Sequence, residues 1–224
     1  MLLYKIYLIS AIIFYKYDMP TQRIGFVAPS DPILRKKAEI IPANKITSSE
    51  TKENIEYMLD KAYGEQQDRK KPILVGLAAP QVGNLKRIIL VDIGADGKGG
   101  VSNLRAYIDP EITWKSDEEA EWYEGCYSTD RVCGIVSRPI NIRVKAYTPI
   151  GEEIEEEHSG YVARIFQHEI DHLNGREFVA HITDDDNLHW VEDDEWPQYR
   201  NDEGWRDWPK KCSREKWQKI KGIK

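Results

Sequence analysis

Residues 159–174 read SGYVARIFQHEIDHLN, and this stretch decides the fold of the chain. Ser159 can cap the start of a helix, and Asn174-Gly175 favours a left-handed stop at its end. Apolar side chains recur between them at helical spacing, which predicts a helix that is buried on most sides. These apolar residues are Tyr161, Val162, Ile165, Phe166, Ile170 and Leu173.

The same helix carries an HExxH motif, HEIDH at 168–172. His168 and His172 are four residues apart, so both imidazoles lie on one helix face and can bind one metal ion. Glu169 follows the first histidine and can take and return the proton of a water that the metal activates. Two surface histidines are the alternative, but the apolar surroundings disfavour it because a buried imidazole pair needs partners.

A catalytic metal site needs a third protein ligand, for which the chain offers two candidates. The extended zinc-protease pattern HExxHxxGxxH fails, because its last histidine is replaced by Phe178. Glu192 has the spacing of another protease class, but it lies in an acidic stretch typical of a solvated loop. Cys126, in EGCYS at 124–128, is the better candidate because thiolates bind divalent metals strongly. A lone cysteine is nevertheless more often a small core residue.

The chain before this helix predicts one further helix and several strands. The first helix begins at position 48 or 49, is capped by Ser49 and ends near Tyr63. Residues 111–124 mix charged and aromatic side chains, which indicates a strand with one face in solvent. The order helix, strands, buried helix indicates an α+β fold. Short apolar runs between turn residues predict the other strands at 73–79, 87–93, 104–108 and 142–147.

Composition limits the compartment and the partners. The 224 residues are 41% hydrophobic and 31% charged, which suits a soluble domain with a substantial core. The formal net charge of -6 gives no overall attraction to nucleic acid, so we expect no DNA partner. The chain has three cysteines, Cys126, Cys133 and Cys212. A small and odd number of cysteines does not indicate a disulfide framework. We therefore expect a reducing compartment, the cytoplasm.

The two ends of the chain differ in composition from the residues between them. Residues 1–18 are an apolar extension, whose run at 2–14 is too short for a transmembrane helix and lacks a clear signal-peptide cleavage site. Three interpretations of this run stay open: a membrane-associating tail, a terminal strand or helix packed on the domain, and an extension upstream of the true start. We favour the last, with the functional start at Met19 and a catalytic domain at 19–183. Residues 184–224 form a second extension that is acidic and rich in tryptophan and ends in a basic segment.

A third segment, GLAAPQVG at 76–83, joins the two motifs already described. Gln81 offers an amide donor that can stabilise an oxyanion, and the small residues let backbone approach a ligand closely. Taken alone, this segment is typical of a buried strand that ends in a turn. Together and in this order, GLAAPQ, EGCYS and QHEIDHLNG closely resemble the three signature motifs of the peptide deformylases. The resemblance covers roughly residues 23–182.

The resemblance implies a fold and a reaction. It implies small sheets packed around the HExxH helix, with Cys126, His168 and His172 as metal ligands and Glu169 as the general acid and base. The implied metal is Fe²⁺, which Zn²⁺, Ni²⁺ or Co²⁺ can replace. The implied reaction removes the N-formyl group from the N-terminal formylmethionine of new polypeptides and releases formate. We expect a monomeric enzyme whose partners are N-formylmethionyl peptides.

The resemblance also implies how the substrate is held. The side chain of Gln81 and the backbone N–H of Tyr127 would hold the formyl oxygen as it becomes an oxyanion. Gly76 would keep the backbone close to the substrate. Three apolar residues are candidates for a slot that takes the methionine side chain, although each is also a plausible core residue: Trp122, Tyr161 and Ile165.

Three positions depart from the family pattern. Leu74 replaces the first glycine of GxGLAAPQ, Asp130 stands at a usual proline, and Cys133 stands at an arginine near the bound peptide. Arg131 can substitute for that arginine from a nearby position. Because these changes affect the peptide groove, a non-catalytic or substrate-shifted relative that binds peptide N-termini stays open as an alternative. A metallopeptidase that uses Glu192 is the other.

The basic segment at 210–224 has two interpretations. The first is a solvated helix that tryptophans anchor on the domain, which we favour. The second is what the resemblance implies: members of the family can meet the ribosome through a basic C-terminal element, here by contacts with phosphates.

Overall fold

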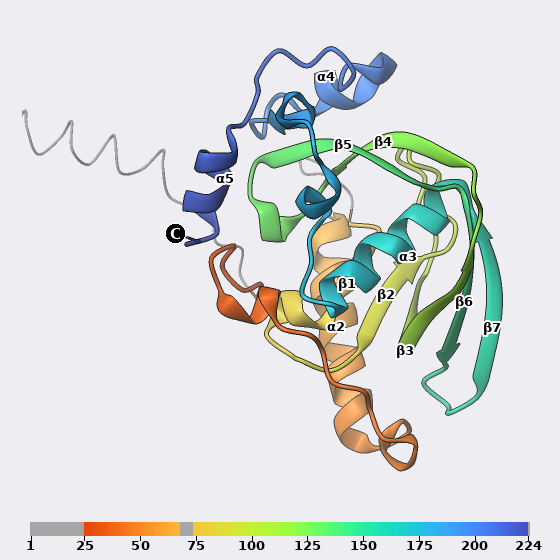
Figure 1. The fold of residues 1–224 in the computed structure, drawn as a ribbon. Coiled ribbons are helices and arrows are strands. Elements are labelled where there is room, and N and C mark those ends of the chain that lie inside the picture. Colours follow the sequence, from red (N-terminus) through yellow and green to blue (C-terminus); the bar gives the residue numbers. More distant parts are fainter. Residues whose placement is uncertain (1–24, 68–73, 224) are drawn as a thin grey trace, which may run out of the picture.

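The computed structural model describes residues 25–67 and 74–223, and the expectations for residues 1–18 and Met19 lie outside them. The described part forms two antiparallel sheets, of order β1-β2-β3-β6-β7 and β4-β5-β8, and confirms the predicted α+β fold. In Figure 1 the strands curve around α3 (Gly160–Leu173), while α2 (Ser49–Gln67) lies outside. The strands are β1 (Gly76–Ala78), β2 (Ile88–Asp92), β3 (Leu104–Lys115), β4 (Glu119–Gly125), β5 (Val132–Pro139), β6 (Asn141–Tyr147), β7 (Glu153–Ser159) and β8 (Leu188–Trp190).

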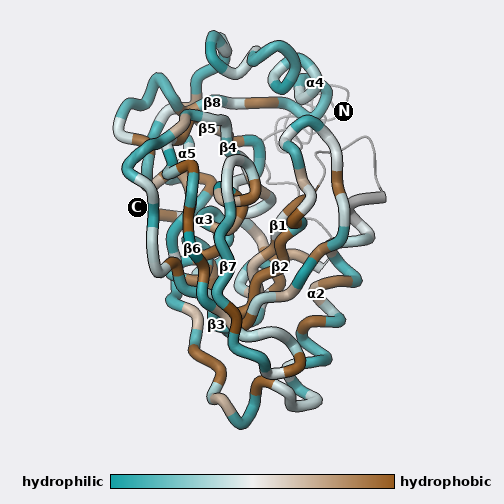
Figure 2. The backbone as a smooth tube through the Cα atoms, turned by 90° about the vertical axis from the view of Figure 1, so that its right-hand side faces the viewer, coloured by the Kyte–Doolittle hydropathy of each residue, from teal (hydrophilic) through white to brown (hydrophobic). Residues whose placement is uncertain are grey.

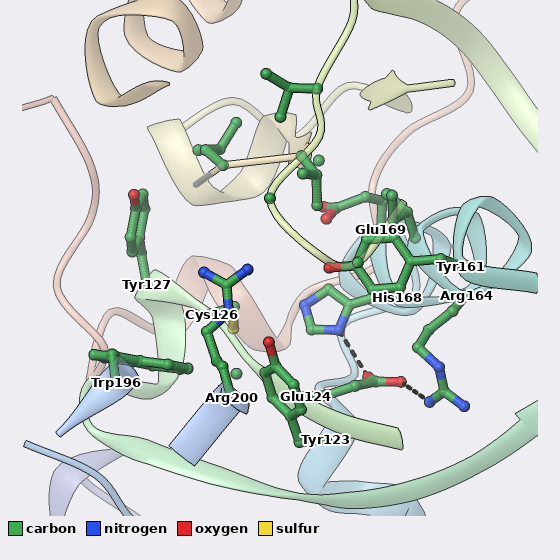
Figure 3. Close-up of a pocket in the computed structure, with 18 of the residues that line it drawn as sticks. Tyr123, Glu124, Cys126, Tyr127, Tyr161, Arg164, His168, Glu169, Trp196 and Arg200 are labelled. Carbon is green, nitrogen blue, oxygen red and sulfur yellow. Dashed lines mark hydrogen bonds and ion pairs between the residues drawn. The ribbon is translucent and has the colours of Figure 1, made fainter. Parts of the chain in front are cut away.

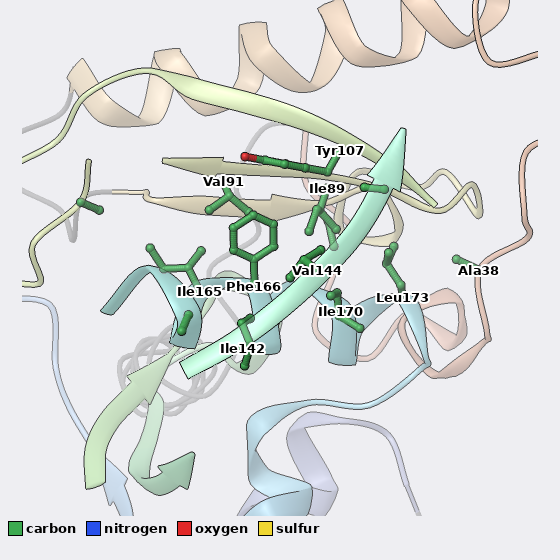
Figure 4. Close-up of a cluster of buried hydrophobic side chains, with 14 residues drawn as sticks. Ala38, Ile89, Val91, Tyr107, Ile142, Val144, Ile165, Phe166, Ile170 and Leu173 are labelled. Carbon is green, nitrogen blue, oxygen red and sulfur yellow. The ribbon is translucent and has the colours of Figure 1, made fainter. Parts of the chain in front are cut away.

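Helix α3 is buried as its apolar pattern predicts. Phe166 and Leu173 are fully buried and belong to one cluster with residues of β2 and β6 (Figure 4). Ser159 holds the N-cap position but makes no capping hydrogen bond with its side chain. Gly175 has a φ of +69°, so the predicted left-handed stop is confirmed.

Strand β2 is buried on both faces. Ile89 and Val91 point to the α3 cluster, whereas Ile88 and Leu90 join a second cluster with residues of α2. Alternation along a strand sends successive side chains to opposite faces, so a continuous apolar run suits a strand between two helices. Figure 2 shows this hydrophobic course along β1 and β2, and the more hydrophilic outer strand β7.

Two local predictions are wrong. The hydroxyl of Ser48, not Ser49, accepts the capping hydrogen bond, from the backbone N–H of Thr51 at 3.3 Å. The single strand predicted at 111–124 is two strands that belong to different sheets, β3 and β4. The chain turns between them, where the hydroxyl of Ser116 donates to the carbonyl of Glu118 at 2.9 Å. Charged and aromatic side chains continue on both sides of this turn, which hides it in the sequence.

The segment predicted as a C-terminal extension, residues 184–224, is joined to the rest of the fold by β8, which pairs with β5. It continues through α4 (Trp196–Arg200) and α5 (Arg214–Ile220). Its Tyr199, Trp205 and Trp208 are buried in a cluster that also contains Cys133 of β5. The thiol of Cys133 is therefore a core contact beneath the extension, and burial raises its pKa well above the usual value. No described helix has both the length and the apolar character needed to cross a membrane.

Candidate active site

A pocket lies beside α3, and residues from all three sequence motifs line it (Figure 3). His168 and Glu169 line it from α3, Gly76 from β1, and Cys126 and Tyr127 from the segment after β4. The motifs are far apart in the sequence, and the sheets that wrap α3 bring them together.

Two side chains that line this pocket, Cys126 and His168, form a group that suits a metal ion with the buried His172 behind them. One ligand atom each of Cys126, His168 and His172 lie within 4.8 Å of one another. His172 is 1% exposed, and neither of its ring nitrogens has a hydrogen-bond partner within the described ranges 25–67 and 74–223. Burial and the neighbouring His168 hold the pKa of His172 well below its usual value. A neutral, buried, unpartnered imidazole is the state that a metal ligand requires, so these residues fit a metal.

His168 is oriented by a buried carboxylate that the sequence predictions did not include. Its Nδ1 lies 2.8 Å from Glu124, and because a carboxylate only accepts, Nδ1 carries the proton and Nε2 stays available to a metal. Glu124 also binds Arg138 at 2.6 Å and Arg164 at 2.7 Å. Burial raises the pKa of Glu124, but Arg138 and His168 outweigh it and hold the pKa well below the usual value.

Two sequence signals for this network were available. Glu124 stands two residues before Cys126 in a quoted motif, and Arg164 is a charge within the apolar helix, four residues before His168. A buried arginine needs a carboxylate, and Glu124 supplies it.

Glu169 is a buried carboxylate without a complete set of partners. It is 5% exposed, and its Oε2 has no hydrogen-bond partner among the described residues. Burial raises its pKa to about 7. Gly76 makes room for it, because a Cβ at that position would collide with the Glu169 carboxylate and lie 2.7 Å from Ile165 Cγ2. A carboxylate with a pKa near neutrality can exchange protons at physiological pH.

The amide of Gln81 has a fixed direction. Its Oε1 accepts from the backbone N–H of Ala78 at 2.8 Å, so its Nε2 points the other way and donates to the Ser128 hydroxyl at 3.2 Å. An amide nitrogen has two hydrogens, and Ser128 takes one of them. Gln81 and Tyr127 both line the pocket, and Tyr127 begins a short 3-10 helix at Tyr127–Thr129.

Comparison with known proteins agrees with this arrangement. The family model described as Polypeptide deformylase matches residues 25–187. The chain belongs to the peptide deformylase family. A peptide deformylase of Natranaerobius thermophilus is 40% identical over 151 residues, which cover 66% of this chain and 85% of that protein. One of Thermotoga maritima is 41% identical over 153 residues, covering 68% and 83%.

Solved structures give the same result. A class I type b peptide deformylase from Acinetobacter baumannii has a TM-score of 0.64 at 32% identity, and the match covers 70% of this chain and 98% of that one. The peptide deformylase from Thermotoga maritima has a TM-score of 0.61 at 36% identity and covers 74% and 99%. This deformylase is therefore a hydrolase, and most of its C-terminal extension lies beyond the family match.

The pocket of this deformylase contains some of the residues predicted for the methionine slot. Tyr161 and Ile165 line it. Trp122 does not, because its ring packs against Trp205 of the extension, with centroids 5.7 Å apart, and Tyr123 lines the pocket instead. Trp122 packs beside Tyr161, with ring centroids 6.4 Å apart, and its place in the methionine slot stays a prediction.

The departures from the family pattern also lie here. Leu74, Asp130 and Arg131 line the pocket, whereas Cys133 does not. Arg131 pairs with Glu192 at 3.0 Å. Glu192 also accepts a hydrogen bond from the indole N–H of Trp190 at 2.7 Å. It does not belong to the group of side chains that suits a metal ion. The alternative that made Glu192 a metal ligand is therefore wrong.

A contact from Lys221, which follows α5, holds the segment that carries Tyr127. Lys221, at the C-cap of α5, is 1% exposed and pairs with Glu177 at 2.7 Å. Its Nζ also donates to the backbone carbonyl of Ser128 at 3.0 Å. Ser128 is the partner of Gln81, so Lys221, which follows α5, supports the segment beside Gln81 and Tyr127 although it lies outside the family match.

Replacing Lys221 by alanine is expected to lower the free energy of unfolding by about 3 kcal/mol, because Glu177 loses its buried partner. We also expect a severalfold loss of kcat/KM, since the Ser128 carbonyl loses its anchor. Urea denaturation and steady-state kinetics measure the two effects. The matched control is Lys219→Ala, an exposed lysine of the same helix, which should change neither. Equal behaviour of the two variants would contradict the anchoring role.

Proposed function

We propose that this chain is an active, metal-dependent peptide deformylase that acts in the cytoplasm on newly made polypeptides. It removes the formyl group from their N-terminal methionine and releases formate. The observation that carries the proposal is Glu169, a buried carboxylate with a pKa of about 7 beside the Cys126, His168 and His172 group. A relative from Acinetobacter baumannii, 33% identical with a TM-score of 0.62, is described as bound to Met-Ala-Ser, which supports a peptide occupant.

Cys126, His168 and His172 would hold one divalent metal. One thiolate and two imidazoles suit Fe²⁺, Co²⁺, Ni²⁺ and Zn²⁺, and we propose Fe²⁺ as the resident ion. When bound, the metal supplies a Lewis acid that makes water a strong nucleophile at neutral pH. Glu124 accepts a hydrogen bond from the Nδ1–H of His168, which leaves Nε2 of His168 available to a metal.

Glu169 moves the proton in the proposed reaction. Its carboxylate accepts a proton from the attacking water, whose oxygen adds to the formyl carbon. It then gives the proton to the leaving methionine nitrogen as the C–N bond breaks, so that formate and a free amine leave. A pKa near 7 suits both directions of transfer.

Gln81 and Tyr127 would hold the developing oxyanion. The Nε2–H of Gln81 and the backbone N–H of Tyr127 would donate to the formyl oxygen as negative charge gathers on it. Each well-placed donor contributes about 3 kcal/mol to the stability of such a transition state. The hydrogen bond from Ala78 to Gln81 Oε1 prepares this direction before substrate binds.

Formate release tests the proposed function. The protein is purified without oxygen, loaded with Fe²⁺ or Ni²⁺, and given formyl-Met-Ala-Gln-amide or its N-acetyl analogue. We expect repeated turnovers on the formyl peptide at a rate of about 1 per second or faster. The same protein without metal, and the acetyl peptide, are the controls. Peptide binding without formate release would support the non-catalytic alternative instead.

A contact with the ribosome is a separate proposal that deletion of residues 210–224 cannot test cleanly. Deletion would remove Lys221 from Glu177, and Lys210, Arg214 and Lys216 already contact Glu195, Asp185 and Trp190. Lys219→Glu, on the exposed side of α5, changes the charge without breaking a described ion pair. Co-sedimentation with ribosomes at low salt should fall in this variant if the contact exists, and unchanged co-sedimentation would refute it.

A further inference from the structure

The C-terminal extension supplies one wall of the active-site pocket. Asp193, Trp196 and Arg200 line the pocket, although all three lie beyond the residues that the family model matches. Trp196 and Arg200 are the two ends of α4. In Figure 3 the Arg200 side chain points into the pocket, and Trp196 lies beside it. The extension therefore contributes residues to the part of the pocket where the bound peptide would lie.

Helix α4 is held firmly in this place by Tyr199. Its side chain is fully buried, and its ring packs edge-on against Tyr123 at 5.2 Å and Trp208 at 5.1 Å. Its hydroxyl lies 2.9 Å from Nδ1 of the buried His189. Because a fully buried aromatic anchor precedes Arg200 directly in the chain, the backbone of Arg200 has a defined position at the pocket.

Arg200 differs from the other arginines that line the pocket. Arg164 is paired with Glu124 at 2.7 Å, and Arg131 is paired with Glu192 at 3.0 Å. Arg200 is half-buried and forms no ion pair with any residue in 25–67 or 74–223. A guanidinium has five N–H donors in a planar fork that matches a carboxylate. The Tyr123 hydroxyl is a hydrogen-bonding neighbour of Arg200 and takes part of this fork. Arg200 thus offers the rest of its fork, unpaired with any carboxylate of the described residues, inside the proposed peptide site.

The chemistry of formylated peptides indicates what would use this fork. Their α-amino group is blocked by the formyl group and carries no charge, so it does not repel a nearby cation. Carboxylates are the anionic groups that such peptides can offer. These come either from acidic side chains after the methionine or from the C-terminus of a short peptide.

We propose that Arg200 binds a carboxylate of the substrate and makes this deformylase prefer formyl peptides that carry one close to their N-terminus. The proposal rests on the proposed function, because it places a formyl peptide in this pocket. Arg200 is then a specificity-determining residue contributed by the extension. Trp196, at the start of the same helix, would pack against the peptide beside this ion pair.

Five peptides test the preference and its source. Formyl-Met-Glu-Ala-amide and formyl-Met-Ala-Glu-amide carry a side-chain carboxylate, and formyl-Met-Ala-Gln carries a terminal one. Formyl-Met-Gln-Ala-amide and formyl-Met-Ala-Gln-amide are the neutral controls. We expect at least one carboxylate peptide to exceed its neutral partner in kcat/KM by about five- to twentyfold, because a charge-assisted bidentate contact in a half-exposed place has this strength. The difference should lie mainly in KM, since binding is the step affected.

Variants of Arg200 test whether this residue causes the preference. Arg200→Ala should abolish the preference, and Arg200→Lys should keep part of it. Arg200→Glu should reverse it in favour of formyl-Met-Ala-Lys-amide. The matched control is Arg206→Ala, an exposed arginine of the extension that pairs with Glu203 and does not line the pocket. Calorimetry of the product peptides Met-Ala-Glu-amide and Met-Ala-Gln-amide should show the same ratio in binding.

The outcomes separate this inference from the proposed function. If wild-type protein releases formate from both kinds of peptide equally, the Arg200 proposal is wrong and the deformylase activity stands. A preference that persists in folded Arg200→Ala, or that disappears equally in Arg206→Ala, would also overturn it. If no peptide releases formate but product binding retains the predicted ratio, the proposed function fails while the carboxylate site stands.

Discussion

Replacing Glu169 by alanine or glutamine is expected to lower kcat by about a thousandfold to ten-thousandfold, because the reaction loses its proton carrier. The metal content should stay that of the wild type, since the group that suits a metal consists of Cys126, His168 and His172. Glu169→Gln is the sharper of the two variants. It keeps the volume that fits beside Gly76 and Ile165 and removes only the ability to exchange a proton.

Kinetics and metal analysis must be made on the same preparations. Formate release gives kcat, and elemental analysis gives the metal per chain. Turnover of Glu169→Gln within tenfold of the wild type would refute the proton-transfer role. Loss of metal together with activity would show instead that Glu169 supports the metal group.

The second large effect is expected for Glu124→Gln. The substitution removes the negative charge that two buried arginines, Arg138 and Arg164, share with His168. We expect the free energy of unfolding to fall by about 3–5 kcal/mol, because buried cations are left without their partner. We also expect the metal affinity to fall by about ten- to a hundredfold, because His168 loses the acceptor that fixes its tautomer.

Glu121→Gln is the control for this prediction. Glu121 lies on the same strand, but its side chain is 60% exposed and it faces Arg206 at 3.7 Å. Surface pairs of this kind contribute little to stability, so the control should unfold like the wild type. Urea unfolding and competition with a metal chelator measure the two effects. A Glu124→Gln protein that matches Glu121→Gln in both would contradict the network.

The sequence predicted α3 and the candidate metal ligands better than it predicted the C-terminal extension. The α3 pattern was readable because its apolar spacing and its stop signal are local, and Gly175 needs the φ of +69° that such a stop requires. The grouping of Cys126 with His168 and His172 was predictable because three short motifs are jointly specific. No single motif placed Cys126 there, since its distance from α3 depends on how β4 packs.

The contribution of the extension was not predictable in the same way. Its strand β8 spans only Leu188–Trp190, and its tryptophans follow no helical or alternating period. Arg200 reaches the pocket only because Tyr199 packs on Tyr123, a contact between residues far apart in the chain. The same packing buries Cys133 beneath the extension, at a position where the family pattern has an arginine near the bound peptide.

Product analysis by mass spectrometry tests the central claim most directly. Formyl-Met-Ala-Gln-amide is incubated with an equal amount of metal-loaded protein for one turnover, and every product is identified. The account predicts one formate for each intact Met-Ala-Gln-amide. Free methionine or formyl-methionine would reveal cleavage of an ordinary peptide bond, and unchanged substrate with full metal occupancy would show a binding protein; either result would contradict the account.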